Sequence, residues 1–181
     1  MIVVCPLAHL SSVVATRSPE RIVSLLDPGS SFPEFGSVVA DRHLKLALHD
    51  VHVSTEGEIA PTAKHIDDLL AFLALWQRTG PLAIHCRAGI GRSTAVAFIA
   101  MCLYNPEVSE LDVARVLRLA SSTARPNESL VRIADVTMKR SGRMTEAIAE
   151  TGRGLPWPAV KEGFPFELPA VLQPTKSLNE K

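Results

Sequence analysis

The chain has 181 residues, 46% of them hydrophobic and 21% charged, a composition typical of a folded globular domain. Nineteen basic residues balance nineteen acidic ones, so there is neither the basic surplus of a nucleic-acid binder nor a polybasic patch for a membrane surface. No apolar run approaches the roughly 20 residues that span a bilayer. We therefore expect no nucleic-acid partner and no membrane partner, while the oligomeric state stays open.

The cysteines indicate a cellular compartment. Cys5, Cys86 and Cys102 are an odd set without CxxC spacing, which argues against a disulfide framework or a zinc site. The amino-terminal run Met1–Leu10 is apolar but lacks a positively charged start, so we interpret it as a first strand and not as a signal peptide. These features predict a protein of the reducing cytoplasm.

Short apolar runs alternate with helical patterns along the chain. The expected strands are Ile2–Val4, Arg21–Leu26, Leu44–Leu48 and Leu82–His85. The expected helices are Leu7–Ser18, a segment from Pro61 or Thr62 to Arg78, Ser93–Tyr104, Leu111–Ser121, Asn127–Lys139 and Met144–Glu150. This alternation predicts an α/β fold in which helices flank a central, mostly parallel sheet. Ligands of such folds bind at the carboxyl ends of the strands.

The composition changes near residue 155. Residues 155–181 contain five prolines together with Trp157, Phe164 and Phe166. We expect a domain over residues 1–154, followed by a Pro-rich strap or tail over 155–181. A strap packed on the domain is favoured because aromatic residues are scarce in disordered segments.

The segment after the strand Leu82–His85 carries the chemistry. Cys86 and Arg92 are separated by five residues, two of them glycines, and the segment leads from a buried strand into a helix. Glycines allow successive N–H groups to face an anion, and the start of the next helix adds partial positive charge. Arg92 offers a planar fork of donors to two phosphate oxygens, and the positive field favours the thiolate of Cys86.

The neighbours of this loop have expected roles of their own. Ser93 can donate a hydrogen bond to the Cys86 sulfur, and His85 is expected to brace the loop without touching substrate. A single cysteine before a glycine turn is usually an inert core residue. The paired cysteine and arginine make that alternative remote here. A P-loop nucleotide site is excluded because no Gly-Lys-Ser/Thr follows the glycines.

The motif His85-Cys86-(five residues)-Arg92-Ser93 resembles the signature loop of the protein-tyrosine and dual-specificity phosphatases. The pattern through Arg153 is similar to small bacterial tyrosine-phosphatase-like proteins. The resemblance implies a cysteine-phosphatase fold with Cys86 as the nucleophile. It also implies that Ser93 assists Cys86 in catalysis and that Arg92 binds the phosphate. The implied phosphate-binding residues are Arg87, Ala88, Gly89, Ile90, Gly91 and Arg92. It implies neither a metal nor an organic cofactor.

The resemblance extends to two other segments. His49-Asp50 stands where compact dual-specificity enzymes carry an acidic loop, which implies Asp50 as general acid, with Glu56 and Glu58 as alternatives. Ala124-Arg125-Pro126-Asn127 resembles a stretch after the second helix of that group. Asn127 is then either a residue that positions the catalytic water or braces the loop, or the N-cap of the next helix.

The sequence departs from the family pattern in ways that bear on substrate. No Trp-Pro-Asp triplet is present, and the only tyrosine is Tyr104, within an expected helix. Lipid-directed relatives often place lysines where this chain has Arg87 and Ile90. The expected reaction is hydrolysis of phosphotyrosine or phosphoserine/threonine in proteins. The alternatives are the same mechanism on an inositol phosphate or a nucleic-acid 5′ end, or binding of phosphorylated partners without turnover.

Two further hypotheses concern metal and redox chemistry. His43, His49 and His52 lie near Asp50, but their spacing fits no common set of metal ligands, and we expect no metal site. Cys5 ends the first strand and could form a reversible disulfide with Cys86, although a buried core cysteine is the simpler interpretation.

Overall fold

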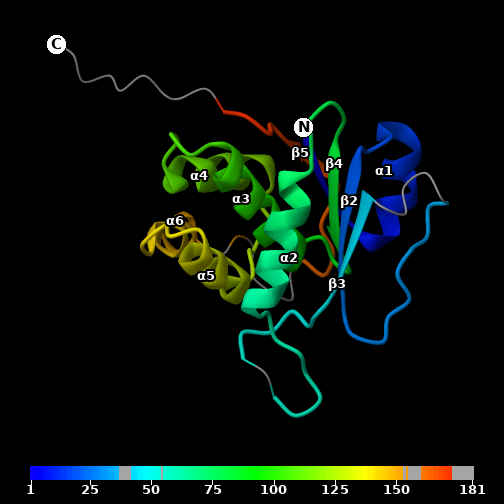
Figure 1. Cartoon of the computed structure of the whole chain (residues 1–181), viewed down its shortest axis with the longest axis horizontal. Coiled ribbons are helices and arrows are strands. Elements are labelled where there is room, and N and C mark those ends of the chain that lie inside the picture. Colours follow the sequence, from blue (N-terminus) through cyan, green and yellow to red (C-terminus); the bar gives the residue numbers. More distant parts are fainter. Residues whose placement is uncertain (37–41, 54, 153, 155–159, 173–181) are drawn as a thin grey trace.

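A computed structural model describes residues 1–36, 42–53, 55–152, 154 and 160–172. Within them, a five-stranded sheet has the order β3-β2-β4-β1-β5 (Figure 1). Its strands are β1 (Ile2–Pro6), β2 (Arg21–Leu26), β3 (His43–Ala47), β4 (Leu82–Cys86) and β5 (Phe166–Leu168). All pairs are parallel except β1 with β5, which confirms the expected α/β fold with a mostly parallel sheet.

The central strands are buried on both faces, which explains their continuous apolar sequences. Every residue of β1 and β4 is buried, as expected for strands of a parallel sheet covered by helices. The edge strand β3 is less buried and contains Lys45. The parallel strands all end at the same edge of the sheet, so the end of β4 at Cys86 lies beside the end of β2.

Helices cover the two faces unequally. A short 3₁₀ turn η1 (Leu7–His9) and α1 (Leu10–Arg17) lie on one face. The other face carries the remaining helices, which lie on the opposite side of the sheet in Figure 1. These are α2 (Ala63–Ala74), α3 (Arg92–Tyr104), α4 (Glu110–Ala120), α5 (Glu128–Thr137) and α6 (Arg143–Thr151).

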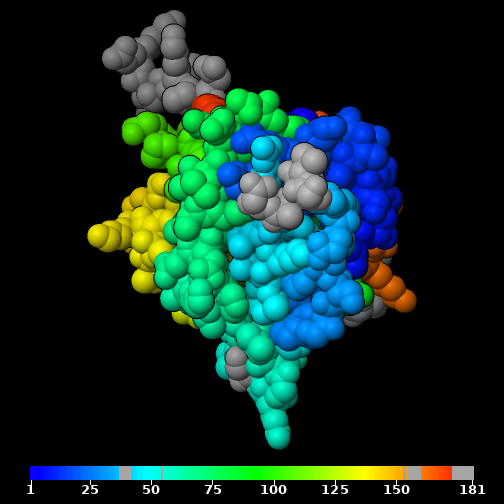
Figure 2. Space-filling view, turned by 45° about the vertical axis from the view of Figure 1, so that its right-hand side comes forward, coloured from blue at the N-terminus to red at the C-terminus, as the bar shows by residue number. Residues whose placement is uncertain are grey.

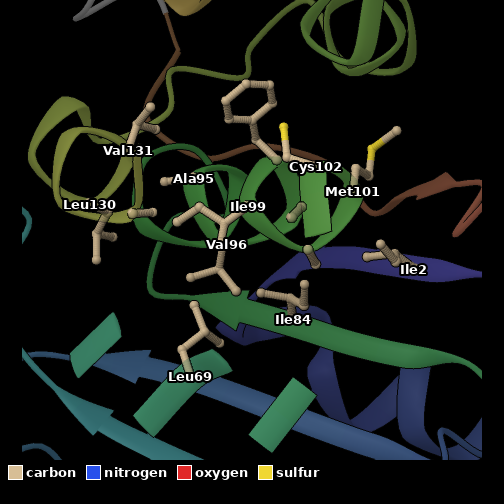
Figure 3. Packing of buried hydrophobic residues seen from close by; sticks show 14 of the residues in the cluster. Ile2, Leu69, Ile84, Ala95, Val96, Ile99, Met101, Cys102, Leu130 and Val131 are labelled. Atoms are coloured by element: carbon tan, nitrogen blue, oxygen red, sulfur yellow. The ribbon is translucent and has the colours of Figure 1, made fainter. Parts of the chain in front are cut away.

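Helix α3 is the centre of the larger core. Its residues from Arg92 to Cys102 are all buried, and those from Ala95 to Cys102 are all apolar, so the helix is not amphipathic. Figure 3 shows Val96 above Ile84 of β4 and near Leu69 of α2. All three side chains are fully buried, and each contributes about 1.5–3 kcal/mol through the hydrophobic effect. This packing fixes the first turn of α3 relative to the end of β4.

The expected and observed elements differ mainly at their ends. Helix α2 stops at Ala74, earlier than the expected Arg78, because the chain turns and Arg78 adopts a left-handed conformation with φ of 63°. Trp76 is still buried and donates to the Gly80 carbonyl over 3.0 Å. The expected helix Leu7–Ser18 is divided into η1 and α1.

The segment after residue 159 returns to the sheet. Strand β5 pairs with β1, and Leu168 is only 1% exposed. Asn105, just after α3, accepts from the Leu172 amide over 2.6 Å and donates to the Ala170 carbonyl over 3.0 Å. The sequence analysis did not predict β5. Trp157, which was expected in the Pro-rich strap, lies outside the described residues.

The connection from β3 to α2 projects from the body of the molecule at the carboxyl edge of the sheet (Figures 1 and 2). Its base is closed by His49, whose amide donates to the Ile59 carbonyl over 2.8 Å while its Nδ1 accepts from the Ile59 amide over 2.9 Å. Asp50 is therefore held at the root of this projection. In the described part of the chain, no helix combines the length and apolar character needed to cross a membrane.

Candidate active site

The loop between β4 and α3 curls around the sulfur of Cys86. Cys86 is the last residue of β4 and is 1% exposed. Its Sγ accepts from the Gly89 amide over 3.2 Å and lies 3.2 Å from the Ser93 hydroxyl. Gly89 has φ of +71°, and a Cβ there would lie 2.7 Å from the Pro6 nitrogen. Only glycine allows the loop to pack this closely against the end of β1.

The outer rim of the loop is tied to the rest of the protein through its carbonyl groups. The carbonyls of Arg87, Ala88, Ile90 and Gly91 accept from the amides of Leu7, Gly163, Arg125 and Asn127, over 3.2, 2.8, 2.9 and 3.2 Å respectively. In a trans peptide the N–H points opposite to the C=O. The amides that follow these carbonyls therefore face into the loop, as the Gly89 bond to sulfur illustrates. The result is an inward-facing set of donors suited to an oxyanion.

Arg92 is fixed on one edge and unpaired on the other. Its Nη1 donates to Asp27 Oδ1 over 2.8 Å and to the Leu48 carbonyl over 2.6 Å. Its Nε is buried and has no hydrogen-bond partner among the described residues. The Nε and Nη2 atoms form the edge of the guanidinium that binds two oxygens at once. A buried donor without a partner is costly, so a ligand oxygen at this edge would satisfy it.

Asp50 lies over the start of α3. Its Oδ1 accepts from Asn127 Nδ2 over 2.7 Å, and its Oδ2 lies 4.0 Å from Arg92 Nε. A Cβ on Gly91 would collide with the Asp50 carboxylate, so a side chain there would displace the candidate acid. The side chain of Asp50 is 41% exposed, which leaves it open to a bound ester. The structure thus brings Cys86, Arg92, Ser93 and Asp50 to one edge of the sheet.

A cavity of about 580 Å³ adjoins this group. Ala88, Ile90 and Gly91 of the loop form one wall, and Asp50 lies at its margin. The opposite walls come from α5, α6 and the segment at Val160–Lys161. The cavity therefore begins beside the phosphate-sized loop and has room for the rest of a bound molecule.

His85 faces the opposite side of the sheet from Cys86, as alternation along β4 requires. Its Nε2 lies 2.5 Å from the Ser24 hydroxyl on β2, which is also 2.6 Å from Nε2 of His43 on β3. Burial lowers the pKa of His85 to about 4, and burial with nearby Lys45 lowers that of His43 to about 4. Both rings are therefore neutral near pH 7 and bridged by one hydroxyl, while the bracing role of His85 stays a prediction.

Asn127 combines the two contacts that were weighed as alternatives. Its Oδ1 accepts from the Leu130 amide over 3.0 Å, which makes it the N-cap of α5. Its Nδ2 meanwhile holds Asp50, and its amide holds the Gly91 carbonyl. One residue thus connects a helix start, the candidate acid and the loop.

Asp27 is the site residue that the sequence analysis missed. The Asp-Pro-Gly turn concealed it, although it follows β2 directly and so lies at the same sheet edge as Asp50. This position directly after a strand is the sequence feature that could have identified Asp27 as a site residue. Besides Arg92, its carboxylate lies 3.7 Å from Nε of Arg87. It therefore adds negative charge behind two cations of the loop.

The disulfide between Cys5 and Cys86 finds no support in the geometry. Cys5 pairs in register with His85, so its side chain lies on the face opposite that of Cys86. The two side chains also belong to different hydrophobic clusters. Burial, with a smaller effect of Cys86, raises the pKa of Cys5 to about 12, which keeps it a thiol. Cys5 and Cys102 are core residues.

The other acids considered are placed differently. Glu58 bonds to Thr55 within the projecting connection, and Glu56 is exposed on the same connection. Asp68 pairs with Lys64 on the exposed side of α2. Across the described residues, no group of three or more histidine, cysteine, aspartate or glutamate side chains is arranged to hold a metal ion.

The fold and the loop define a cysteine-phosphatase architecture, and comparisons with known proteins agree. The family model of the protein-tyrosine phosphatases matches residues 52–127, which include the signature loop and Asn127. No curated protein matches the chain significantly. The match of the protein-tyrosine phosphatase model over these residues agrees with the resemblance seen in the sequence.

Three solved structures illustrate the shared fold. Human DUSP28 superposes with a TM-score of 0.56 at 16% identity, covering 77% of this chain and 95% of its own. DUSP15 gives 0.55 at 16% identity, with 83% and 89% covered. PTPMT1 in complex with PI(5)P gives 0.53 at 14% identity, with 83% and 92% covered. At these identities the likeness concerns the fold alone.

Proposed function

We propose that the protein hydrolyses phosphomonoesters through a phosphocysteine on Cys86. The observation that carries the proposal is the buried Arg92 Nε, which has no hydrogen-bond partner among the described residues and borders a loop of inward-facing amides. Such a group of donors fits the equatorial oxygens of a phosphoryl group in transfer. The sulfur of Cys86 lies at the centre of the same loop.

In the first step the Cys86 thiolate attacks phosphorus in line with the leaving oxygen. The S–P bond forms as the P–O bond breaks, and Asp50 transfers its proton to the departing oxygen. Arg92 and the loop amides stabilise the charge on the transferring group. Asp27 and the Leu48 carbonyl keep the guanidinium oriented, so that less of its binding energy is spent on ordering.

In the second step water attacks the phosphocysteine. Asp50, now a carboxylate, takes the proton of the water, and the S–P bond breaks to release inorganic phosphate. Ser93, 3.2 Å from the sulfur, donates a hydrogen bond that stabilises the departing thiolate. Asn127 keeps Asp50 over the loop in both steps.

The substrate is a separate question from the reaction type. Phosphotyrosine and phosphoserine/threonine in proteins stay a prediction, as does the alternative of a non-protein ester. PTPMT1, which shares the fold, forms a complex with PI(5)P, so this fold also accommodates a phosphate ester that is not a protein. Binding without turnover is disfavoured because candidates for the nucleophile, the phosphate-binding arginine and the general acid are all present.

The test is phosphate release from 4-nitrophenyl phosphate by the purified protein in the presence of a chelator. We expect turnover that vanadate inhibits, because vanadate mimics the trigonal transition state. Cys86→Ser should abolish turnover while keeping ester binding, and Cys102→Ala is the control for changing a buried cysteine. Activity of Cys86→Ser above a few per cent of the original would contradict the assigned nucleophile.

A further inference from the structure

The cavity beside the loop is lined by two cations that have no hydrogen-bond or ion-pair partner among the described residues. Arg125 and Lys161 both line it. Neither side chain makes a hydrogen bond or ion pair with any residue that the structure describes. By contrast, Arg17, Arg115, Arg140 and Arg143 each have a carboxylate partner.

The carboxylates of the same cavity are already engaged. Asp50 accepts from Asn127 and faces Arg92, so its charge is balanced at the loop. Glu128 has an interaction of its own. The remaining lining side chains include the apolar Ile90, Val131 and Ile148. The cavity is therefore largely apolar, and Arg125 and Lys161 are its charged side chains without a partner among the described residues.

The position of Asp50 defines which part of a substrate enters this cavity. Asp50 lies between the phosphate-binding loop and the cavity, and its proton goes to the leaving oxygen. The leaving group must therefore extend from Asp50 into the cavity. Arg125 is fixed there by its backbone amide, which donates to the Ile90 carbonyl over 2.9 Å.

The size and shape of the cavity restrict the leaving group. Its volume of about 580 Å³ lies within the range of about 300–1,000 Å³ that is usual for small-molecule sites. Helices α5 and α6, side by side in Figure 1, form one wall, and Val160 and Lys161 contribute another. The described walls therefore fit a compact leaving group better than a chain of several residues.

We infer that the substrate is a compact phosphomonoester whose leaving group carries a second anionic group, held by Arg125 and Lys161. The inference rests on the proposed hydrolysis and adds the chemical class of the leaving group. A carboxylate or a second phosphate fits the two cations equally. The guanidinium of Arg125 supplies directional hydrogen bonds, and the ammonium of Lys161 adds a point charge.

The test uses two aryl esters that differ only in charge. These are 4-(carboxymethyl)phenyl phosphate and its neutral isostere 4-(carbamoylmethyl)phenyl phosphate, with phenyl phosphate as the reference. We expect kcat/KM to be at least about tenfold higher for the carboxylate ester, since hydrogen bonds to charged groups contribute that much. In the double variant Arg125→Gln/Lys161→Gln the preference for the carboxylate ester over the carbamoyl ester should fall to within about twofold.

A matched control and a binding measurement complete the design. Arg132→Gln removes an exposed arginine of α5 outside the cavity and should keep the full preference. Calorimetry of both esters with Cys86→Ser measures the same preference without turnover. If all esters are hydrolysed at equal rates, the inference is overturned and the proposed function stands. If none is hydrolysed, the proposed function fails, and equal binding by Cys86→Ser would overturn the inference as well.

The size restriction is tested with a phosphotyrosyl peptide that has neutral flanking residues. We expect its kcat/KM to lie below that of the carboxylate ester, because the peptide lacks the second anionic group and its flanking chain exceeds a cavity of about 580 Å³. A higher value for the peptide would overturn the compact substrate class and favour the phosphoprotein alternative.

Discussion

Asn127 Nδ2 donates a hydrogen bond to Asp50 Oδ1 over 2.7 Å, and this bond joins two segments that are 77 residues apart in the chain. Asp50 lies at the root of the projecting connection between β3 and α2, whereas Asn127 begins α5. The bond holds the candidate acid against the loop that carries Cys86. The first predictions concern these two residues.

Asp50→Ala should lower kcat by about 10²–10⁴-fold for phosphotyrosine or an alkyl phosphate, because the leaving oxygen then departs unprotonated. The loss should be much smaller for 4-nitrophenyl phosphate, whose leaving group needs little protonation. Steady-state rates on both esters measure the difference. Glu58→Gln is the matched control on the same connection. If Glu56→Gln or Glu58→Gln loses the phosphotyrosine activity while Asp50→Ala keeps it, the acid has been assigned to the wrong residue.

Asn127→Ser should separate the two contacts of Asn127. Serine is also a good N-cap, so the free energy of unfolding should change by less than about 0.5 kcal/mol. The donor to Asp50 is lost, and kcat should fall about tenfold as the carboxylate loses its orientation. Urea unfolding and steady-state kinetics on one protein sample measure both effects. An unchanged kcat would show that capping is the whole role of Asn127.

Asp27→Ala should lower kcat/KM by up to about a hundredfold, because the Arg92 fork is no longer held in position. Inhibition by vanadate should weaken in parallel, since the same fork binds the oxyanion. Asp27→Asn keeps an acceptor for Nη1 and should lose less. Asp67→Ala, on the exposed side of α2, is the control. Unchanged vanadate inhibition in Asp27→Ala would refute the positioning role.

Because two histidines are buried, we expect the free energy of unfolding to decrease in acid. Burial lowers the pKa of His85 from 6.5 to about 4, so the unfolded chain binds a proton first as the pH falls. The stabilisation is complete above pH 6.5 and is lost progressively between about pH 6.5 and 4, with a magnitude on the order of 3 kcal/mol. His43, which is partly exposed, adds a smaller effect of the same sign.

Urea unfolding at pH 7 and pH 4.5 measures this loss. His85→Gln removes the titrating ring, so its stability should decrease less between the two pH values than that of the original protein. His9→Gln, at an exposed position, should behave like the original. Equal losses in all three proteins would assign the acid instability to the carboxylates.

The sequence predicted those elements whose determinants are local. Arg21–Leu26 was predicted with its observed bounds, because a buried strand of a parallel sheet is a continuous apolar run between turn residues. The loop from Cys86 to Arg92 was predictable because a glycine-containing turn between strand and helix is readable without knowledge of its neighbours. Asp50 was implied by the resemblance, and its place after a strand agrees with the rule that ligands bind at the ends of parallel strands.

Contacts between distant segments were not predictable in the same way. Strand β5 is only three residues long and lies in a Pro-rich segment, so no periodicity marks it. Asp27 belongs to the site because its carboxylate accepts a hydrogen bond from Arg92, which lies 65 residues further along the chain. The end of α2 at Ala74 was missed because Trp76 falls at the next apolar position of the helical pattern. Trp76 is buried, but it belongs to the turn that follows the helix.

The bond from the Gly163 amide to the Ala88 carbonyl, over 2.8 Å, has a consequence for biosynthesis. A ribosome delivers the strands of the parallel sheet and helices α2–α6 before residues 163–168. Until those residues emerge, β1 is an unpaired edge with five apolar or small residues, and such edges promote association between nascent chains. The rim of the phosphate-binding loop is completed by the same late event. Protection of the sheet edge and completion of the catalytic loop therefore coincide in time, so a partly synthesised chain would be both prone to aggregation and poor at binding phosphate.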